Sequence, residues 1–187
     1  MQLNAGNLIN ASQCEDWLAV DIGFSCAKKT TGVMGAHWDK PRCIQYGQLI
    51  NECLRFVDGK SAVGLIIEAP LSMAFNHANN PTGRKVEKRD GKTRYWYQGL
   101  GCSVMTAAGL FLRTLSEANS PAIAYVFEGL VSFKDRATNH GDDAADLIRN
   151  RKNIVNGTDL LAKESDRIIS LMSLWGGDRA IPGLIST

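Results

Sequence analysis

The sequence lacks several features that would assign it to a special class of protein. Its five cysteines are odd in number and include no CxxC pair, which weighs against a disulfide framework and against a zinc knuckle. No window approaches the roughly 18 apolar residues that span a membrane, and no basic segment followed by an apolar one opens the chain. We therefore expect free thiols, a cytoplasmic location and no membrane partner.

The chain also has little excess charge. Its 21 Lys and Arg residues against 19 Asp and Glu give a net charge of +2, so any nucleic-acid surface must be local. A length of 187 residues, with 44% hydrophobic and 21% charged residues, fits one globular domain and argues against extensive disorder. We expect a single domain over residues 1–187.

Short apolar runs alternate with segments of helical spacing. The apolar runs predict strands at residues 17–25, 30–38, 43–49 and 62–70, and a later one, AIAYVFEG, with Glu128 at its end. Helical spacing predicts helices at about 48–57, 101–117, 142–151 and 158–175. A long polar loop is expected at about 72–99, and such loops in compact domains are usually functional or disordered. The order predicts an α/β fold with a mixed five-stranded sheet flanked by helices.

Two acids interrupt the apolar strands. Asp21 lies within WLAVDIGFS, and Glu68 stands at the end of AVGLIIEAP. A buried carboxylate must be paired, hydrogen-bonded or bound to a metal, because an isolated charge is costly to bury. If the two strands are neighbours, both acids point to one edge of the sheet. A helix that starts near residue 142 then brings Asp143 or Asp146 against them.

Such a carboxylate cluster predicts a metal site. Like charges repel unless a cation neutralises them, and Mg²⁺ or Mn²⁺ prefers oxygen ligands of this kind. Two such ions about 4 Å apart can activate a water and stabilise the leaving oxygen when a phosphodiester is cleaved. The chemistry expected is hydrolysis without a protein nucleophile.

Three motifs resemble the ribonuclease H-like superfamily: AVDIGFS followed by a strand hairpin, LIIEAPLS at a later strand end, and HGDDAADLI opening a C-terminal helix. Within it, the chain is similar to Holliday-junction resolvases, whose final helix carries an aspartate pair spaced like Asp143 and Asp146. It resembles more closely a family of uncharacterised predicted nucleases of this fold, with motifs like IEAPL, VFEGLVSF and HGDDAADLI. The resemblance covers roughly residues 17–152 and implies a three-layer domain with nuclease activity.

The resemblance also implies site residues. Those implied as metal-binding and catalytic are Asp21, Glu68, Asp143 and Asp146, and those implied as accessory are Glu128 and Asp142. The chain departs from the motifs at Gly141, which stands inside the His-Asp-Asp motif, and at Glu68, where the closer family has Asp. The longer side chain moves the carboxylate by about one methylene, to which a preorganised site is sensitive. Junction resolvases act as dimers because their substrate has two-fold symmetry, but the sequence shows no dimer interface.

Helix geometry divides the three aspartates of HGDDAADLI. Asp142 and Asp143 point about 100° apart, whereas each is three or four residues from Asp146. We predict that Asp143 and Asp146 bind metal and that Asp142 caps the helix or supports the ligands. Acids in a first helical turn are also favoured as caps and by the helix dipole, so a purely structural role stays open for each. His140 either assists as metal ligand or proton carrier or makes an ordinary hydrogen bond.

The polar loop contains a basic and aromatic segment, GRKVEKRDGKTRYWY. Its residues predicted to bind nucleic acid are Arg84, Lys85, Lys88, Arg89, Lys92, Arg94, Tyr95 and Trp96. Cations neutralise backbone phosphates and aromatic rings stack on unpaired bases, so the segment is expected to grip DNA or RNA. A solvated loop whose aromatic residues anchor it to the core remains an equal alternative.

Two other functions stay open. VDIGFSCAKKTTGV also resembles the first phosphate loop of the sugar-kinase and actin-like ATPases, although those enzymes close two such domains around a nucleotide. A non-catalytic module that binds nucleic acid or serves as a scaffold is the third. The first interpretation is a nuclease dependent on Mg²⁺ or Mn²⁺.

Overall fold

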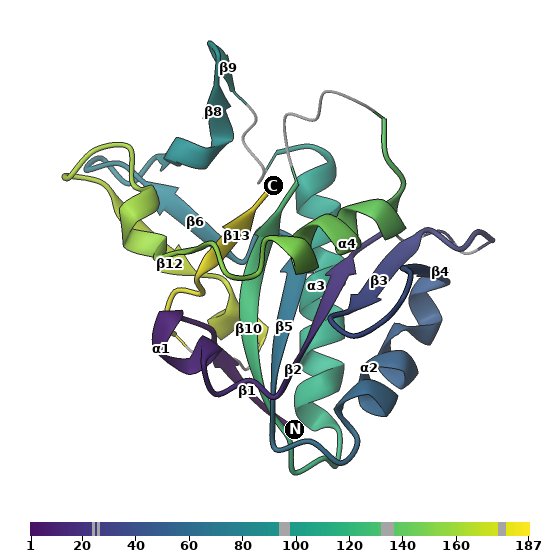
Figure 1. The fold of residues 1–187 in the computed structure, drawn as a ribbon. Helices are drawn as coiled ribbons and strands as arrows, with labels where there is room; N and C mark the ends of the chain where they lie inside the picture. Colours follow the sequence, from purple (N-terminus) through teal and green to yellow (C-terminus); the bar gives the residue numbers. More distant parts are fainter. Residues whose placement is uncertain (24, 26, 94–97, 132–136, 176–178) are drawn as a thin grey trace.

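The computed structural model describes residues 1–23, 25, 27–93, 98–131, 137–175 and 179–187, and its centre is an eight-stranded mixed sheet (Figure 1). Seven strands follow the order β11-β13-β10-β5-β2-β3-β4, and β1 pairs with the first half of β10. Their bounds are β1 Gln2–Ala5, β2 Asp16–Asp21, β3 Thr31–Gly35, β4 Arg42–Ile44, β5 Ala62–Glu68, β10 Ile123–Leu130, β11 Ile154–Val155 and β13 Leu184–Ser186.

The predicted α/β fold with a mixed sheet is confirmed, but the predicted number of five strands is wrong, because β1, β11 and β13, of two to four residues each, are too short to leave a pattern in the sequence. β2, β3 and β4 form an antiparallel meander, and β5 and then β10 lie parallel to β2 on its other side. The middle strands β2 and β5 are apolar along most of their length because both of their faces are covered. The third expected strand is shorter than its apolar pattern suggested, because the chain turns into a 3₁₀ helix, η1 Tyr46–Gln48, after β4.

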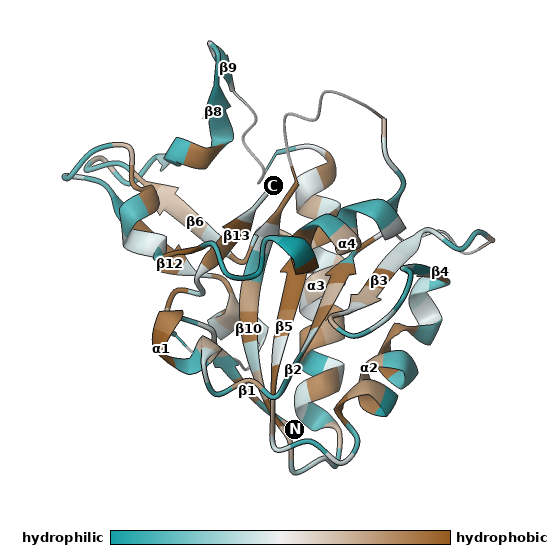
Figure 2. Cartoon of the chain, viewed as in Figure 1, coloured by the Kyte–Doolittle hydropathy of each residue, from teal (hydrophilic) through white to brown (hydrophobic). Residues whose placement is uncertain are grey.

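Helices cover both faces of the sheet (Figure 1). On one face, α2 Leu49–Val57 and α3 Leu100–Glu117 pack against side chains such as Leu18 and Leu65. On the other face, α4 His140–Arg149 packs with Leu147 near Ile66 and Phe127. Each fully buried side chain of this kind contributes about 1.5–3 kcal/mol through the apolar area removed from water. Figure 2 shows the resulting hydrophobic central strands.

The helix predicted at 158–175 is wrong. The described chain there forms η3 Gly157–Leu160, the strand β12 Arg167–Ser170 and η4 Met172–Trp175. β12 pairs antiparallel with β6 Ser72–Phe75. Two consecutive β-branched residues, Ile168 and Ile169, suit a strand, and pairing with β6 outweighs the helical spacing of the apolar residues.

The expected loop at 72–99 is more ordered than its polarity suggested. It contains β6, β7 Pro81–Thr82, η2 Lys85–Glu87, β8 Lys88–Arg89 and β9 Lys92–Thr93. β8 and β9 form a hairpin whose turn residues, Asp90 and Gly91, have φ of 51° and 73°. Positive φ at both positions is what a two-residue turn between twisted strands requires, and Asp-Gly is a favoured pair for it.

The N-terminal segment adds two short elements that we did not predict, β1 and α1 Leu8–Ala11. Asn7 caps α1 by accepting hydrogen bonds from the Ile9 and Asn10 amides. Four residues are too few to show a periodicity, so neither element has a pattern to detect. Among the described residues, no helix combines the length and the apolar character needed to cross a membrane.

Candidate active site

Asp21 and Glu68 end two neighbouring parallel strands, and the strand register pairs them directly. Side chains alternate between the two faces of a sheet. Ala19 and Ile66, two residues before each acid, belong to the core on the α4 side. Both carboxylates therefore face α4, as expected if the two strands are neighbours.

The two acids occupy the middle of a row of four residues. Gly32 of β3 pairs with Asp21, and Gly129 of β10 pairs with Glu68, so the row runs Gly32, Asp21, Glu68, Gly129 across the sheet. A Cβ on Gly32 would lie 1.9 Å from the His140 carbonyl oxygen, and one on Gly129 would lie 2.9 Å from Leu147. The glycines thus let α4 approach the sheet closely at both ends of the row.

Asp143 lies between these two contact points along α4. His140, which contacts β3, is three residues before it, and Leu147, which contacts β10, is four residues after it. The helical turn that carries Asp143 therefore lies over β2 and β5, the two strands between β3 and β10. Asp143 is buried, and its Oδ1 accepts a hydrogen bond of 2.6 Å from Thr138 Oγ1. Asp143 is therefore the aspartate of α4 that faces the Asp21 and Glu68 edge.

His140 binds Asp21 directly. The imidazole Nδ1 lies 2.7 Å from Asp21 Oδ1, and because a carboxylate accepts, Nδ1 is the donor. The imidazole is 44% exposed, whereas the Asp21 side chain is almost fully buried. This contact joins the first residue of α4 to the last residue of β2, and it gives His140 a position in the candidate site.

The other two aspartates of α4 have structural partners. Asp142 forms a capping box with Asn139: the Asp142 amide donates to Asn139 Oδ1, and Asn139 Nδ2 donates to Asp142 Oδ2 at 2.8 Å. Asn139 is thus the N-cap, and Asp142 is the third residue of its capping box; a structural part at the helix start was one of the two roles predicted for Asp142. Asp146 forms an ion pair with Arg149 and is about one quarter exposed. Asp143 and Asp146 thus have different surroundings, although the motif suggested that they act as a pair.

Glu128 does not belong to this group, contrary to the accessory role expected for it. It is one residue out of register with Glu68, which pairs with Gly129, so alternation turns its side chain to the opposite face of the sheet. There it is completely buried and accepts a hydrogen bond of 2.7 Å from Arg84 and one of 2.6 Å from Ser72 Oγ.

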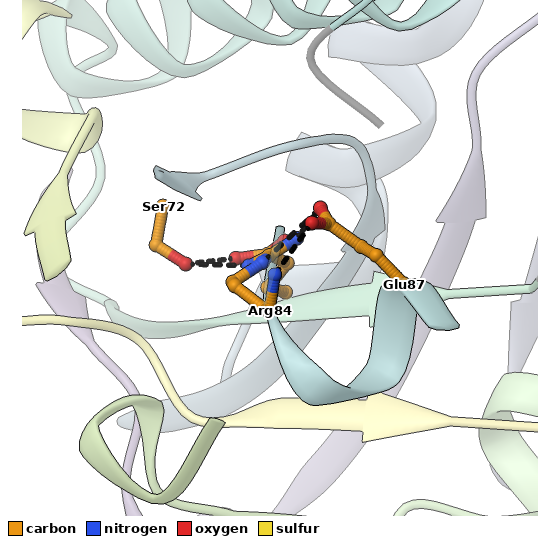
Figure 3. A network of polar contacts seen from close by, with 4 residues as sticks. Ser72, Arg84 and Glu87 are labelled. Atoms are coloured by element: carbon orange, nitrogen blue, oxygen red, sulfur yellow. Dashed lines mark hydrogen bonds and ion pairs between the residues drawn. The ribbon is translucent and has the colours of Figure 1, made fainter. Parts of the chain in front are cut away.

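Arg84 is the centre of this buried network (Figure 3). Its guanidinium is 1% exposed and donates to Glu128, to Ser72 and to Glu87, with which it pairs at 3.0 Å. Arg84 is thus not available to bind phosphate, contrary to expectation. The network instead attaches η2, at the base of the β8–β9 hairpin, to β10 and β6.

Burial raises the pKa of Glu128 above its ordinary value, and the neighbouring Arg84 and Ser72 offset that shift only in part. A carboxyl with a raised pKa in the folded state stabilises the fold most at low pH and loses that contribution as pH rises through the raised value. We therefore expect the stability advantage of the wild type over Glu128→Gln to shrink as pH rises above about 4.5. Urea unfolding of both proteins between pH 4 and 8 measures it, and an advantage that grows with pH would contradict the assignment.

Three exposed basic residues of the polar segment lie on the hairpin. Lys88, Arg89 and Lys92 are all exposed, and Figure 2 shows the hairpin as a hydrophilic projection from the body. In Figure 1 it rises at the end of the molecule toward which β2 and β5 point. Lys85 is exposed but donates to the Asp159 carbonyl oxygen at 3.1 Å. The remaining predicted residues, Arg94, Tyr95 and Trp96, lie outside the described residues.

The carboxylates of Asp21, Glu68 and Asp143 are of the type that binds divalent cations, but their side chains are not arranged as a metal site. No three His, Cys, Asp or Glu side chains in the described part of the chain are arranged to hold a metal ion. Asp21 and Glu68 offer carboxylate oxygens at one edge, with Asp143 above them, which is the donor type that Mg²⁺ and Mn²⁺ take. His140 binds Oδ1 of Asp21 and Thr138 binds Oδ1 of Asp143, so each of these hydrogen bonds engages one oxygen of its carboxylate.

Some residues of the site were not identified from the sequence. Asn139 followed three residues later by an acid is a helix-start signal, and it would have placed the beginning of α4 correctly. The glycines of the row and Thr138 carry no such signal, because their importance depends on what lies opposite them.

Comparisons of the chain with protein-family models, curated proteins and solved structures returned no match.

Proposed function

We propose that the chain is a ribonuclease H-like nuclease that hydrolyses phosphodiester bonds of DNA or RNA with Mg²⁺ or Mn²⁺. The observation that carries the proposal is the row of Gly32, Asp21, Glu68 and Gly129 with Asp143 of α4 above it. A strand hairpin, a second acidic strand end and a helix that carries an aspartate are the three features on which the resemblance to this superfamily rests. Here they meet at one edge of the sheet.

In this proposal, the carboxylates of the row and of α4 bind the metal ions. Asp21, Glu68 and Asp143 supply the oxygen ligands, and a bound cation pair supplies Lewis-acid activation of water and charge stabilisation at the phosphate. His140 holds Asp21 in place through Nδ1 before the ion binds. The close approach of α4, enabled by Gly32 and Gly129, fixes the height of Asp143 above the sheet. The apolar core beneath keeps these positions rigid, which a preorganised site requires.

The β8–β9 hairpin is proposed as the contact to substrate. Lys88, Arg89 and Lys92 are exposed on it, and Arg84 fixes its base through the buried network. A two-stranded ribbon fits the major groove of a duplex, and each phosphate that it neutralises adds to the salt dependence of binding.

Replacing Lys88, Arg89 and Lys92 with Ser should weaken binding of duplex DNA and flatten its salt dependence. Each lost phosphate contact lowers the slope of log K against log salt by about 0.9. Fluorescence anisotropy between 50 and 200 mM salt, about the range where such slopes are measured, provides the test. The matched control removes three exposed cations elsewhere, in Lys40→Ser, Arg113→Ser and Lys163→Ser, and equal slopes in the two triple variants would exclude the hairpin.

A cleavage assay tests the function itself. Single-stranded, duplex, hybrid and branched DNA and RNA are incubated with the protein in Mg²⁺, in Mn²⁺ and in a chelator. Cleavage that requires either metal supports the proposal. Absence of cleavage on every substrate, together with ATP binding by calorimetry, would instead favour the kinase-like alternative.

A further inference from the structure

A hollow lies on the α4 side of the sheet, at the opposite end of β2 from Asp21. Its volume is about 420 Å³, and it is formed by α1, by the start of β2, by the chain after β3 and by the residues that follow α4. Small-molecule sites have volumes of this order. Asp16 at the start of β2 lines it, so about 16 Å of strand separates it from the candidate active site.

Trp17 forms an aromatic wall of the hollow. A Cβ on Gly64 of β5 would lie 2.3 Å from the Trp17 ring, so the indole lies flat on the sheet at a position where only glycine fits beneath it. Phe127 packs against the ring in a tilted arrangement, with centroids 4.9 Å apart and an interplanar angle of 39°. One face of the indole therefore packs on the sheet at Gly64, and Trp17 is among the residues that line the hollow.

Part of the remaining wall is apolar. Leu8, Ala11 and Ile154 contribute aliphatic side chains. Burial raises the pKa of Cys14 to about 11, so its thiol stays neutral and acts as a small apolar group. A planar, uncharged ring system is the ligand part that suits these walls.

Two acids and two basic side chains line the hollow, and each acid has a partner within the fold. The Asp16 carboxylate lies 3.9 Å from Lys60 Nζ and 3.8 Å from His37 Nε2. The second acid, Glu15, accepts a hydrogen bond from the Ser61 amide. The two basic side chains that line the hollow, Arg151 and Lys152, form no ion pair with any residue that the structure describes, and Arg151 donates one hydrogen bond of 2.9 Å to the Ile148 carbonyl oxygen.

We propose that this hollow binds a nucleoside monophosphate, with the base stacked on Trp17 and the phosphate at Lys152 and Arg151. A flat nucleobase matches the indole, the phosphate matches the two basic side chains, which have no ion-pair partner among the described residues, and a mononucleotide fits the volume. The site goes beyond the proposed hydrolysis, because none of its residues belongs to the row that carries Asp21 and Glu68. Stacking and phosphate contacts each contribute, so both parts of the ligand are needed.

Isothermal titration calorimetry with 5′-AMP, GMP, CMP and UMP, in metal-free buffer with a chelator, tests the proposal. At least one monophosphate should bind, and its nucleoside and inorganic phosphate should each bind at least tenfold more weakly. Lys152→Glu should weaken the binding at least tenfold, since it reverses the charge at an exposed position. Lys163→Glu is the matched control, because it makes the same change at another exposed lysine, and it should bind like the wild type.

Two results would overturn the site. One is no binding of any monophosphate by the wild type, and the other is equal affinity in Lys152→Glu and the wild type. Asp21→Asn separates this site from the nuclease proposal. Binding that persists in Asp21→Asn supports the second site whether or not the protein cleaves nucleic acid, and binding that is lost there but kept in Lys152→Glu places the ligand at the other edge.

Discussion

Replacing Arg84 with Met is expected to lower the free energy of unfolding by about 3–5 kcal/mol, because it leaves two acids buried without their cation. Glu128 and Glu87 are 0% and 2% exposed, and Arg84 is the cation that both contact. A methionine fills much of the volume that the arginine occupied, so the loss reflects charge more than packing. Urea unfolding at pH 7, followed by circular dichroism, measures the change.

A neighbouring residue provides the control for this substitution. Lys85→Met removes the same charge one position away, but Lys85 is exposed, and its loss should change stability by no more than about 0.5 kcal/mol. Combining Arg84→Met with Glu87→Met and Glu128→Leu removes the stranded charges together with the cation. Replacing a whole buried ionic group by apolar residues is often neutral, so this triple variant should be more stable than Arg84→Met alone. The opposite order would mean that the network is not the cause.

The strands were predictable because burial on both faces leaves a clear mark on composition. β2, β5 and β10 each carry a run of apolar residues, and the helices α2 and α3 show the spacing of one buried face. Short strands were not predicted where pairing with a neighbouring strand, rather than local composition, decides the structure. β12 forms because β6 lies beside it, and no local property of residues 167–170 reveals that neighbour.

The candidate site shows the same limit in the acids that end strands. Glu68 and Glu128 occupy similar sequence contexts, each at the end of an apolar run. Register separates them: Glu68 pairs with Asp21, whereas Glu128 is displaced by one residue and faces the other side. A displacement of one residue changes the face of a side chain, and only the assembled sheet defines it.

The basic segment was only partly predictable for a related reason. A sequence shows that an arginine is present but not which carboxylates lie near it in space. Arg84 meets Glu128 from a strand 44 residues away, so the same positive charge that suggested a phosphate contact proves to be structural. The exposed lysines of the hairpin have no carboxylate partner in the part of the chain that the structure describes, and they remain candidates for substrate contact.

Replacing Asp21 with Asn is expected to reduce metal-dependent cleavage about 1,000-fold, since ion ligation in such sites is worth several kcal/mol in the transition state. The change is isosteric and keeps an oxygen that can accept from His140 Nδ1. Initial rates on the best substrate of the panel measure the effect, and Mn²⁺ titration by calorimetry should show weaker binding in the same variant. Asp39→Asn, in the exposed turn after β3, is the control and should retain full activity.

Substitutions of Asp143 and Asp146 test which aspartate of α4 binds the metal. Asp143 is buried over β2 and β5, whereas Asp146 is engaged by Arg149. Asp143→Asn should therefore lose nearly as much activity as Asp21→Asn, and Asp146→Asn should lose distinctly less. If the two variants lose equally, Asp146 must leave Arg149 to bind metal, and Arg149→Ala should then raise metal affinity by freeing it. Full activity in both Asp21→Asn and Asp143→Asn would exclude this edge of the sheet as the active site.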